Sequence, residues 1–568
     1  MIEFLIHIVF KMKRRILIIS GNSLFFVFVL LTFLRVGYPQ PEKVQLAYDR
    51  YHSYNEMVEI LQKLEKTYPQ LIKVRSIGKS FEGRNLMIAE VTNYLTGSVD
   101  KKPGIYIDGN LHAGEVTGAE TALHTLWCLV SFYGSDKIIT DLLDHLVFYI
   151  LPKVNPDGSE FYLHNAEWIR GNIRPFDDDG DGRMDEDPAN DLDKDGEIMQ
   201  MRVPDPVGDW KIDPKDTRNM VKREPWEQEG QFFKIYSEGI DDDNDGSFNE
   251  DGTGGLDLNR NFPALWNPEF IQHGAGPYPI SEPETKAAVK FILEHPNIGV
   301  IINYHTAGRL LNIPTGENPR QEKSNEEDKK IFELIGSKYT DIVGGPVKLA
   351  GYRLSGMFIV WGYQHTGAIA LLPELWRMGK DYNNDGQINS YEELRWNDEV
   401  LNRKGFVEWT PFNHPQLGQL EIGGWLEKFV RQNPPGAFLK EICDQHYRWT
   451  IYIASLLPRL EIVHLESKKL SRELFKITGI VRNLGYYPTN ITHQAVIARA
   501  VAPVLAKLEL PKGAEILMGK EETNLGQIDG NFGERIAEWL ILSPGSGEVC
   551  LKVISTRAGT AVKKIRLR

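Results

Sequence analysis

A chain of 568 residues is too long for one small domain and predicts about two to four folding units. Its composition of 42% hydrophobic and 10% aromatic residues excludes a chain that is disordered throughout, because it can bury large cores. The net charge of -13 argues against a nucleic-acid partner, since binding to the phosphate backbone needs a basic surface.

Residues 1–37 have the features of an export signal. Basic residues at 12–15 precede an apolar tract that culminates at 24–34, an order typical of a signal peptide or an N-terminal signal anchor. No small-residue cleavage site follows, so both interpretations stay open. We expect a secreted or extracytoplasmic protein, attached to a membrane only through an uncleaved N-terminal anchor.

Residues 46–457 are expected to form one α/β domain. Helical patterns at 117–133 and 281–295, the second with Ser281 as its expected N-cap, alternate with strand-like segments. This alternation predicts a mostly parallel or mixed central sheet flanked by helices. Four apolar runs have the length of buried strands: 104–109, 146–152, 298–304 and 367–373.

Three of these runs end in side chains that can bind a metal or move a proton. His112 and Glu115 follow the first run, His305 follows the third, and Glu374 ends the last. The pair at 112 and 115 alone would also fit a polar turn. Because ligands bind at the carboxyl ends of strands in such sheets, the two histidines and Glu115 together predict a catalytic zinc site. Glu374 could then take a proton from water. The second run ends in NPDG, which indicates a turn.

A turn at 255–263 carries the adjacent residues Asn259 and Arg260. Beside a zinc site, a guanidinium group can pair with a carboxylate through two hydrogen bonds. The turn therefore predicts a substrate with a free C-terminus.

These motifs, in chain order, resemble those of the zinc carboxypeptidase family, the carboxypeptidase A-like metallocarboxypeptidases or funnelins. The resemblance covers about residues 46–457 and rests on LHAGE, NPDG, LNRNF, NYHTAG, GYRLSG and LLPELW, together with the opening segment GKSFEGRNL. It implies an exported zinc carboxypeptidase that hydrolyses the C-terminal peptide bond of peptides or proteins.

The resemblance also implies roles for single residues. His112, Glu115 and His305 match the ligands of one zinc ion, and Glu374 matches the general base that takes a proton from the zinc-bound water. Asn259 and Arg260 match the clamp on the terminal carboxylate of the substrate. The remaining matches are Arg170 for the oxyanion, with Arg174 as the alternative because the spacing is loose, Tyr352 as the substrate cap, and Ile359 near the position that sets side-chain preference.

One position departs from the family. An arginine precedes the glutamate of the first motif in the family, and Gly114 stands there in this chain. The subsite contact that this arginine would make is therefore not expected, whereas zinc binding is unaffected.

Acidic insertions at 177–202, 241–252 and 381–392 carry four D-x-[DN]-x-D-G loops. They bring little apolar content of their own, and Ca²⁺ bound to carboxylates could order them. The 381–392 loop matches a whole EF-hand-like loop, with Asp381, Asn383, Asp385, Gln387 and Glu392 as candidate ligands. The other loops lack the final glutamate and would need help from neighbouring carboxylates. Their candidate ligands are Asp177, Asp179, Asp181, Asp191, Asp193, Asp195, Asp241, Asp243 and Asp245.

Residues 460–568 have a different sequence pattern. Short alternating segments, among them HQAVIARAV, are separated by Gly, Pro and Asn turns. This pattern predicts a C-terminal domain with an all-β, sandwich-like fold.

Two other functions remain open at this stage. An amidase or peptidase of the same fold could act on peptidoglycan stem peptides. A calcium-binding adhesion or binding protein with a degenerate peptidase fold is the non-enzymatic alternative.

Overall fold

The computed structural model describes residues 44–177, 180, 182–244, 246–314, 325–349 and 355–567. The export signal expected in 1–37 lies outside these residues, as do Tyr352, Asp179, Asp181 and Asp245. In the described part of the chain, no helix is both long and apolar enough to cross a membrane.

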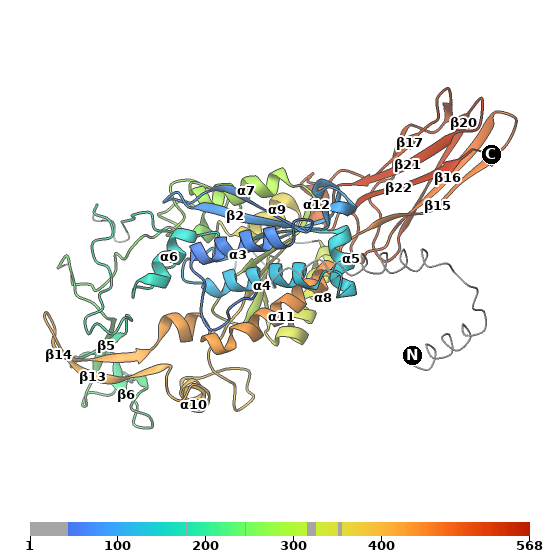
Figure 1. Ribbon diagram of the computed structural model, residues 1–568. Helices are drawn as coiled ribbons and strands as arrows, with labels where there is room; N and C mark the ends of the chain where they lie inside the picture. The colour runs from blue at the N-terminus through green and yellow to red at the C-terminus, as the bar shows by residue number, and fades with distance from the viewer. Residues whose placement is uncertain are drawn as a thin grey trace, which may run out of the picture. The chain divides into compact units, whose positions relative to one another are not determined.

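An eight-stranded mixed sheet lies at the centre of the part that precedes the C-terminal strands (Figure 1), with the order β1-β2-β4-β3-β9-β12-β10-β11. Its central strands β4, β3, β9 and β12 run parallel, while β2 and β10 flank them in antiparallel orientation. All four predicted strands are confirmed. The bounds are β1 (Ile72–Lys79), β2 (Asn85–Val91), β3 (Gly104–Gly109), β4 (Val147–Leu151), β9 (Ile298–Tyr304), β10 (Leu310–Ile313), β11 (Val347–Leu349) and β12 (Ile369–Glu374).

Helices cover both faces of this sheet. In Figure 1, α7 and α9 are drawn above β2, and α3, α4 and α11 below it; α4 packs on β3 and β9, and α9 packs on β12. Every residue of β3, β4 and β9 is buried as a result. The helices are α3 (Tyr54–Thr67), α4 (Val116–Phe132), α5 (Lys137–His145), α6 (Pro156–His164), α7 (Pro283–Glu294), α8 (Glu326–Val343), α9 (Phe358–Thr366), α10 (Ser390–Val400) and α11 (Gly436–Ser455), with short 3₁₀ turns η2 (Tyr94–Thr96), η3 (Val99–Lys101) and η4 (Leu258–Arg260) and a π-helical segment η5 (Glu427–Gln432).

One predicted helix cap and one predicted turn are wrong. Ser281 is not the N-cap of α7, because Pro283 occupies the first turn and Glu282 precedes it without a side-chain cap; the Ser281 hydroxyl donates to Glu282 Oε1 instead, at 2.8 Å. The NPDG segment is not an isolated turn. It starts α6, because the Asn155 side chain accepts from the amide of Gly158.

Segments that lie mostly between and after the acidic insertions form a second sheet, which the sequence interpretation missed. Its order is β13-β14-β5-β8-β6-β7. Strands β5 and β14 pair although they lie far apart along the chain. A small core of Met199, Met201, Val203, Leu420 and Ile422 holds it together, so these segments are not only loops. The bounds are β5 (Gln200–Pro204), β6 (Trp210–Ile212), β7 (Met220–Lys222), β8 (Phe233–Ser237), β13 (Phe406–His414) and β14 (Gly418–Trp425).

The C-terminal part forms two four-stranded sheets, β15-β16-β20-β18 and β19-β17-β21-β22, drawn in orange and red in Figure 1. Buried side chains of both sheets, such as Ile477, Trp539 and Leu551, share one core, which confirms the predicted β-sandwich class. The bounds are β15 (Leu460–Lys469), β16 (Leu474–Asn483), β17 (Leu505–Glu509), β18 (Glu515–Met518), β19 (Glu522–Asn524), β20 (Glu534–Leu542), β21 (Glu548–Ser555) and β22 (Gly559–Arg566).

One predicted strand of this part is wrong. The HQAVIARAV segment contains the short helix α12 (His493–Ile497) rather than a strand. The hydroxyl of Thr492 accepts from the amide of Ala495 and caps the helix, which satisfies an amide that a strand would have paired elsewhere.

Arg557 joins the sandwich to the preceding α/β part. Its side chain is 1% exposed and donates to three carbonyl oxygens, those of Pro296 at 3.2 Å, Gly367 at 2.9 Å and Thr366 at 2.6 Å. Burial lowers the pKa of Arg557 to about 9. Two of the carbonyls belong to the C-terminal end of α9, so the arginine caps that helix.

We expect Arg557→Met to lower the free energy of unfolding by about 3 kcal/mol, because buried carbonyl groups would lose their charged donor. Urea denaturation followed by circular dichroism measures the change. Arg566→Met, at an exposed position of β22, is the control and should change stability by less than about 0.5 kcal/mol. Equal stability of the two variants would contradict a capping role.

Candidate functional site

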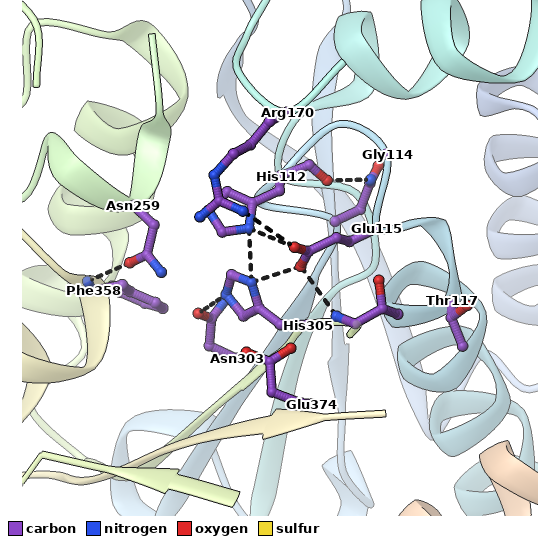
Figure 2. A network of polar contacts seen from close by, with 12 residues as sticks. His112, Gly114, Glu115, Thr117, Arg170, Asn259, Asn303, His305, Phe358 and Glu374 are labelled. Carbon is purple, nitrogen blue, oxygen red and sulfur yellow. Dashed lines mark hydrogen bonds and ion pairs between the residues drawn. The ribbon is translucent and has the colours of Figure 1, made fainter. Parts of the chain in front are cut away.

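His112, Glu115 and His305 come together at the carboxyl ends of two neighbouring strands, β3 and β9 (Figure 2). The Nδ1 atom of His112 lies 2.8 Å from Glu115 Oε1, and that of His305 lies 2.7 Å from Glu115 Oε2. The two Nδ1 atoms are 3.0 Å apart. All three side chains are buried, and the ligand-type atoms lie within 4.8 Å of one another. Two imidazole nitrogens and a carboxylate in this arrangement fit one metal ion.

The turn between β3 and α4 puts His112 and Glu115 in place. Asn110 adopts a positive φ of 57°, and its side-chain amide donates to the carbonyl oxygens of His112 and Ala113. A Cβ atom on Gly109 would lie 2.3 Å from the backbone carbon of Gly118. Only glycine therefore allows the strand to approach the helix this closely.

Partners on the far side of each imidazole fix how the rings are protonated. His305 Nε2 lies 2.6 Å from Asn303 Oδ1, and the Asn303 amide nitrogen donates to Asp108 Oδ1 at 2.6 Å. An amide oxygen only accepts, so Nε2 carries a proton, and Nδ1 is the ring nitrogen that can offer a lone pair to a metal in the cluster. Burial raises the pKa of Asp108 to about 7.

Asp257 orients the imidazole ring of His112 and also binds Arg170. Its Oδ1 lies 3.0 Å from His112 Nε2, and its Oδ2 accepts from Arg170 Nε at 2.9 Å. Burial alone would raise the pKa of Asp257, but His112 and Arg170 hold it well below its ordinary value. The carboxylate therefore stays ionised and orients both groups.

Glu374 stands at the end of β12, beside the cluster (Figure 2). Its Oε1 accepts from the side chain of Asn312 at 3.4 Å, whereas Oε2 is buried and has no hydrogen-bond partner among the described residues. Burial and the nearby charge of Glu115 raise the pKa of Glu374 well above its ordinary value. A carboxylate in this environment takes up a proton readily.

These residues line one cavity of about 650 Å³, together with Arg170, Asn259 and Arg260. Arg170 is 38% exposed at its side chain, with Nη1 3.6 Å from Glu115 Oε1. The other two belong to η4 and are buried. The side-chain oxygen of Asn259 accepts from the amide of Phe358 at 2.9 Å, which fixes the asparagine beside the cavity (Figure 2).

Two of the predicted site residues lie elsewhere. Arg174 pairs with Glu282 at 3.0 Å and faces the ring of Phe81, so the cavity receives Arg170 and not Arg174. Ile359 is fully buried within α9 and is absent from the cavity wall, where Met357 is found instead.

The four acidic loops share one turn. In each, the carboxylate of the first aspartate accepts from the amide of the glycine at the sixth position, and that glycine has a positive φ between 83° and 98°. The carboxylates of Asp191, Asp193 and Asp195 come within 4.8 Å of one another. The four pairs are Asp177 with Gly182, Asp191 with Gly196, Asp241 with Gly246, and Asp381 with Gly386.

A family model described as zinc carboxypeptidase matches residues 57–398. This chain belongs to the zinc carboxypeptidase family. Mast cell carboxypeptidase A of Homo sapiens is 24% identical over 341 residues, which cover 57% of this chain and 64% of the human protein. Carboxypeptidase A2 of Mus musculus is 26% identical over 331 residues, which cover 55% and 59%. The chain thus spans about three fifths of the length of the curated relatives it matches.

Two further matches add little to the family assignment. The solved structure of thrombin activatable fibrinolysis inhibitor aligns with 72% of this chain and 74% of its own, at 18% identity and a TM-score of 0.45, a likeness too low to carry an argument. Residues 459–566 match a model described as a domain of unknown function.

Asp257 and Asn303 are the site residues of this zinc carboxypeptidase family member that sequence reasoning missed. Each had a signal. Asp257 stands two residues before Asn259 in the same motif, and Asn303 stands two residues before His305 on one strand, on the same face of the sheet.

The structure explains why the family arginine is missing before Glu115. A Cβ atom on Gly114 would lie 2.7 Å from Tyr162 Cε2 and 2.8 Å from Gln432 Oε1. The space that a side chain would need is thus filled by Tyr162, which is fully buried, and by Gln432 from η5.

We expect Gly114→Ala to lower the free energy of unfolding by about 1–3 kcal/mol through overpacking, and Gly114→Arg to lower it further. Thermal and urea unfolding measure both. Gly545→Ala is the control, since a Cβ there meets no atom within 4 Å. Wild-type stability of Gly114→Arg would show that the site accepts the family residue.

Proposed function

We propose that this protein is an exported zinc carboxypeptidase that removes the C-terminal residue of peptides or proteins. The observation that carries the proposal is the meeting of three ligand-type side chains, Glu374 and the Asn259–Arg260 pair in one cavity. We place the peptidase domain at residues 46–457 and a C-terminal β-sandwich domain at 460–568. The protein would be secreted or extracytoplasmic, and an uncleaved N-terminal segment would anchor it to a membrane.

In this proposal His112 Nδ1, His305 Nδ1 and the Glu115 carboxylate hold one zinc ion. Bound there, zinc supplies Lewis-acid polarisation of a carbonyl group and makes water more acidic. The fit rests on the donors: Asp257 and Asn303 accept hydrogen bonds from the Nε2 atoms, which leaves both Nδ1 atoms, on the side of the Glu115 carboxylate, to bind the metal.

The chain's own groups then perform the proton and charge steps. Arg260 and Asn259 bind the terminal carboxylate of the substrate and place the last peptide bond beside the cluster. Glu374 takes a proton from the attacking water at its unpartnered Oε2 and delivers it to the leaving amine. Arg170 stabilises the negative charge that develops on the carbonyl oxygen. Tyr352 would cap the bound substrate.

We expect Glu374→Gln to lower turnover at least about 100-fold, because it removes the proton carrier, while one zinc ion per chain is retained. Mass spectrometry of a peptide panel measures trimming, and atomic emission measures zinc. Glu399→Gln, at an exposed position of α10, is the control and should trim at the wild-type rate.

The other outcomes distinguish the alternative functions. Trimming by Glu374→Gln at the wild-type rate would refute its assignment as the base, and loss of zinc would assign Glu374 to the metal site. Release of products only from peptidoglycan stem peptides would favour an amidase of this fold. Zinc binding without any hydrolysis would favour a binding protein.

We further propose that calcium binds the acidic loops, most completely the 381–392 loop. In that loop Asp381 accepts from the amides of Asn384 and Gly386, and Glu392 accepts from the amide of Tyr382. These contacts hold the carboxylates of the loop's first and last positions within one compact turn, as an EF-hand-like loop requires.

We expect removal of calcium to speed proteolysis within 177–251 and near 381–392. Bound Ca²⁺ would hold the carboxylates of these loops together, and without it they repel one another. Limited proteolysis after dialysis against a calcium chelator, with zinc restored, measures the rates. Asp381→Asn is the matched variant and should lose protection at its own loop only. Identical cleavage with and without calcium would refute the calcium sites.

A further inference from the structure

We propose that Trp168, held by Gln432, forms a subsite that selects a large apolar side chain on the residue preceding the C-terminal residue of the substrate. This inference rests on the proposed function. It adds a substrate class, which neither the zinc cluster nor the carboxylate clamp specifies.

The backbone holds Trp168 beside the cluster. The amide of Ala113 donates to Arg170 O at 2.9 Å, and that of Gly114 donates to Ile169 O at 3.0 Å. The segment 168–170 therefore lies along the turn that carries His112 and Glu115. Ile169 is 3% exposed and packs in a small core with Ala113. Because side chains of an extended segment alternate, its neighbours Trp168 and Arg170 point the other way, into the cavity that both line.

Gln432 fixes the indole. Its Oε1 accepts from Trp168 Nε1 at 2.7 Å and from the hydroxyl of Tyr162 at 2.9 Å. The next residue, Asn433, donates to the carbonyl oxygen of Gly114 at 2.7 Å and accepts from the hydroxyl of Thr117 at 2.8 Å. The end of η5 is thus tied to the turn of the zinc cluster, and the indole is oriented before any substrate binds.

Gln432 ties Trp168 to the Gly114 side of the cluster. In Figure 2 Asn259 is on one side of the histidines, and Gly114 and Thr117 are on the other. Gln432 fills the space beside Gly114 and holds Trp168. A substrate whose terminal carboxylate is at the clamp and whose last peptide bond is at the cluster would extend toward Trp168 with its preceding residue.

The chemistry of this wall favours an apolar side chain. Trp168 is 47% exposed, its only polar atom is already bonded to Gln432, and Gly114 offers no charge where the family has an arginine. An aromatic or aliphatic side chain would cover the free indole face. The competing features are two cations that line the same cavity, Arg377 and Arg431, which would favour an acidic residue; Arg431 is already paired with Glu427 at 3.0 Å.

The test uses N-blocked tetrapeptides with the same C-terminal phenylalanine and Phe, Leu, Gly, Asp or Lys before it. For the wild type we expect kcat/KM to be about 10-fold higher or more with Phe than with Gly, the discrimination typical of one apolar side chain. Trp168→Ala should bring this ratio close to one, mainly by raising KM for the Phe peptide. Trp168→Phe should restore part of it.

Two further variants sharpen the result. Gln432→Leu keeps the indole but removes its acceptor, and we expect an intermediate ratio. Trp226→Ala removes a tryptophan that is 74% exposed and outside the cavity, and should leave the ratio unchanged. Equal cleavage of all peptides by the wild type, an unchanged ratio in Trp168→Ala, or a preference for Asp would overturn the subsite while leaving the carboxypeptidase intact. Absence of cleavage of every peptide would overturn both.

Discussion

The buried carboxylate of Glu115 between two imidazoles is the interaction on which the rest of the site depends. Burial opposes its ionisation, yet His112 and His305 keep its pKa below the ordinary value. A charge in such a place needs close, well-oriented partners. The glycine contact between β3 and α4 brings Glu115 beneath the strand ends, and Asp257 and Asn303 turn the two rings toward it. Removing any of these supports would leave a charge buried without compensation.

Much of this arrangement could be predicted from the sequence, because the carboxyl ends of parallel strands lie at the same edge of the sheet. The runs before His112, His305 and Glu374 are continuous and apolar, so their register and direction follow from few alternatives. Hydrogen-bond partners were less accessible. That Asn303 reaches Asp108, and that Arg174 turns to Glu282, depends on contacts across the fold, which spacing along the chain does not encode.

The same reasoning explains the two larger differences. Strands β5, β6, β7 and β8 of the second sheet have only three to five residues, too few for a strand pattern to be recognised. The pairing of β5 with β14 joins segments that lie far apart along the chain. In HQAVIARAV the apolar residues suit a strand or a helix, and the cap from Thr492 decides for the helix. Tertiary pairing therefore decides the structure in the second sheet, and one capping hydrogen bond decides it in HQAVIARAV.

Arg557 couples the stability of the sandwich to that of the preceding α/β part. The helix that it caps, α9, begins beside Met357 in the cavity wall and at the amide of Phe358, which positions Asn259. At the far end of that helix, Gly367 caps two carbonyl groups from within the segment, and Arg557 of the sandwich binds the last two carbonyl oxygens. Damage to the C-terminal sheets would therefore be transmitted along a single helix to Asn259, so the sandwich supports the cavity and is not a detachable appendage.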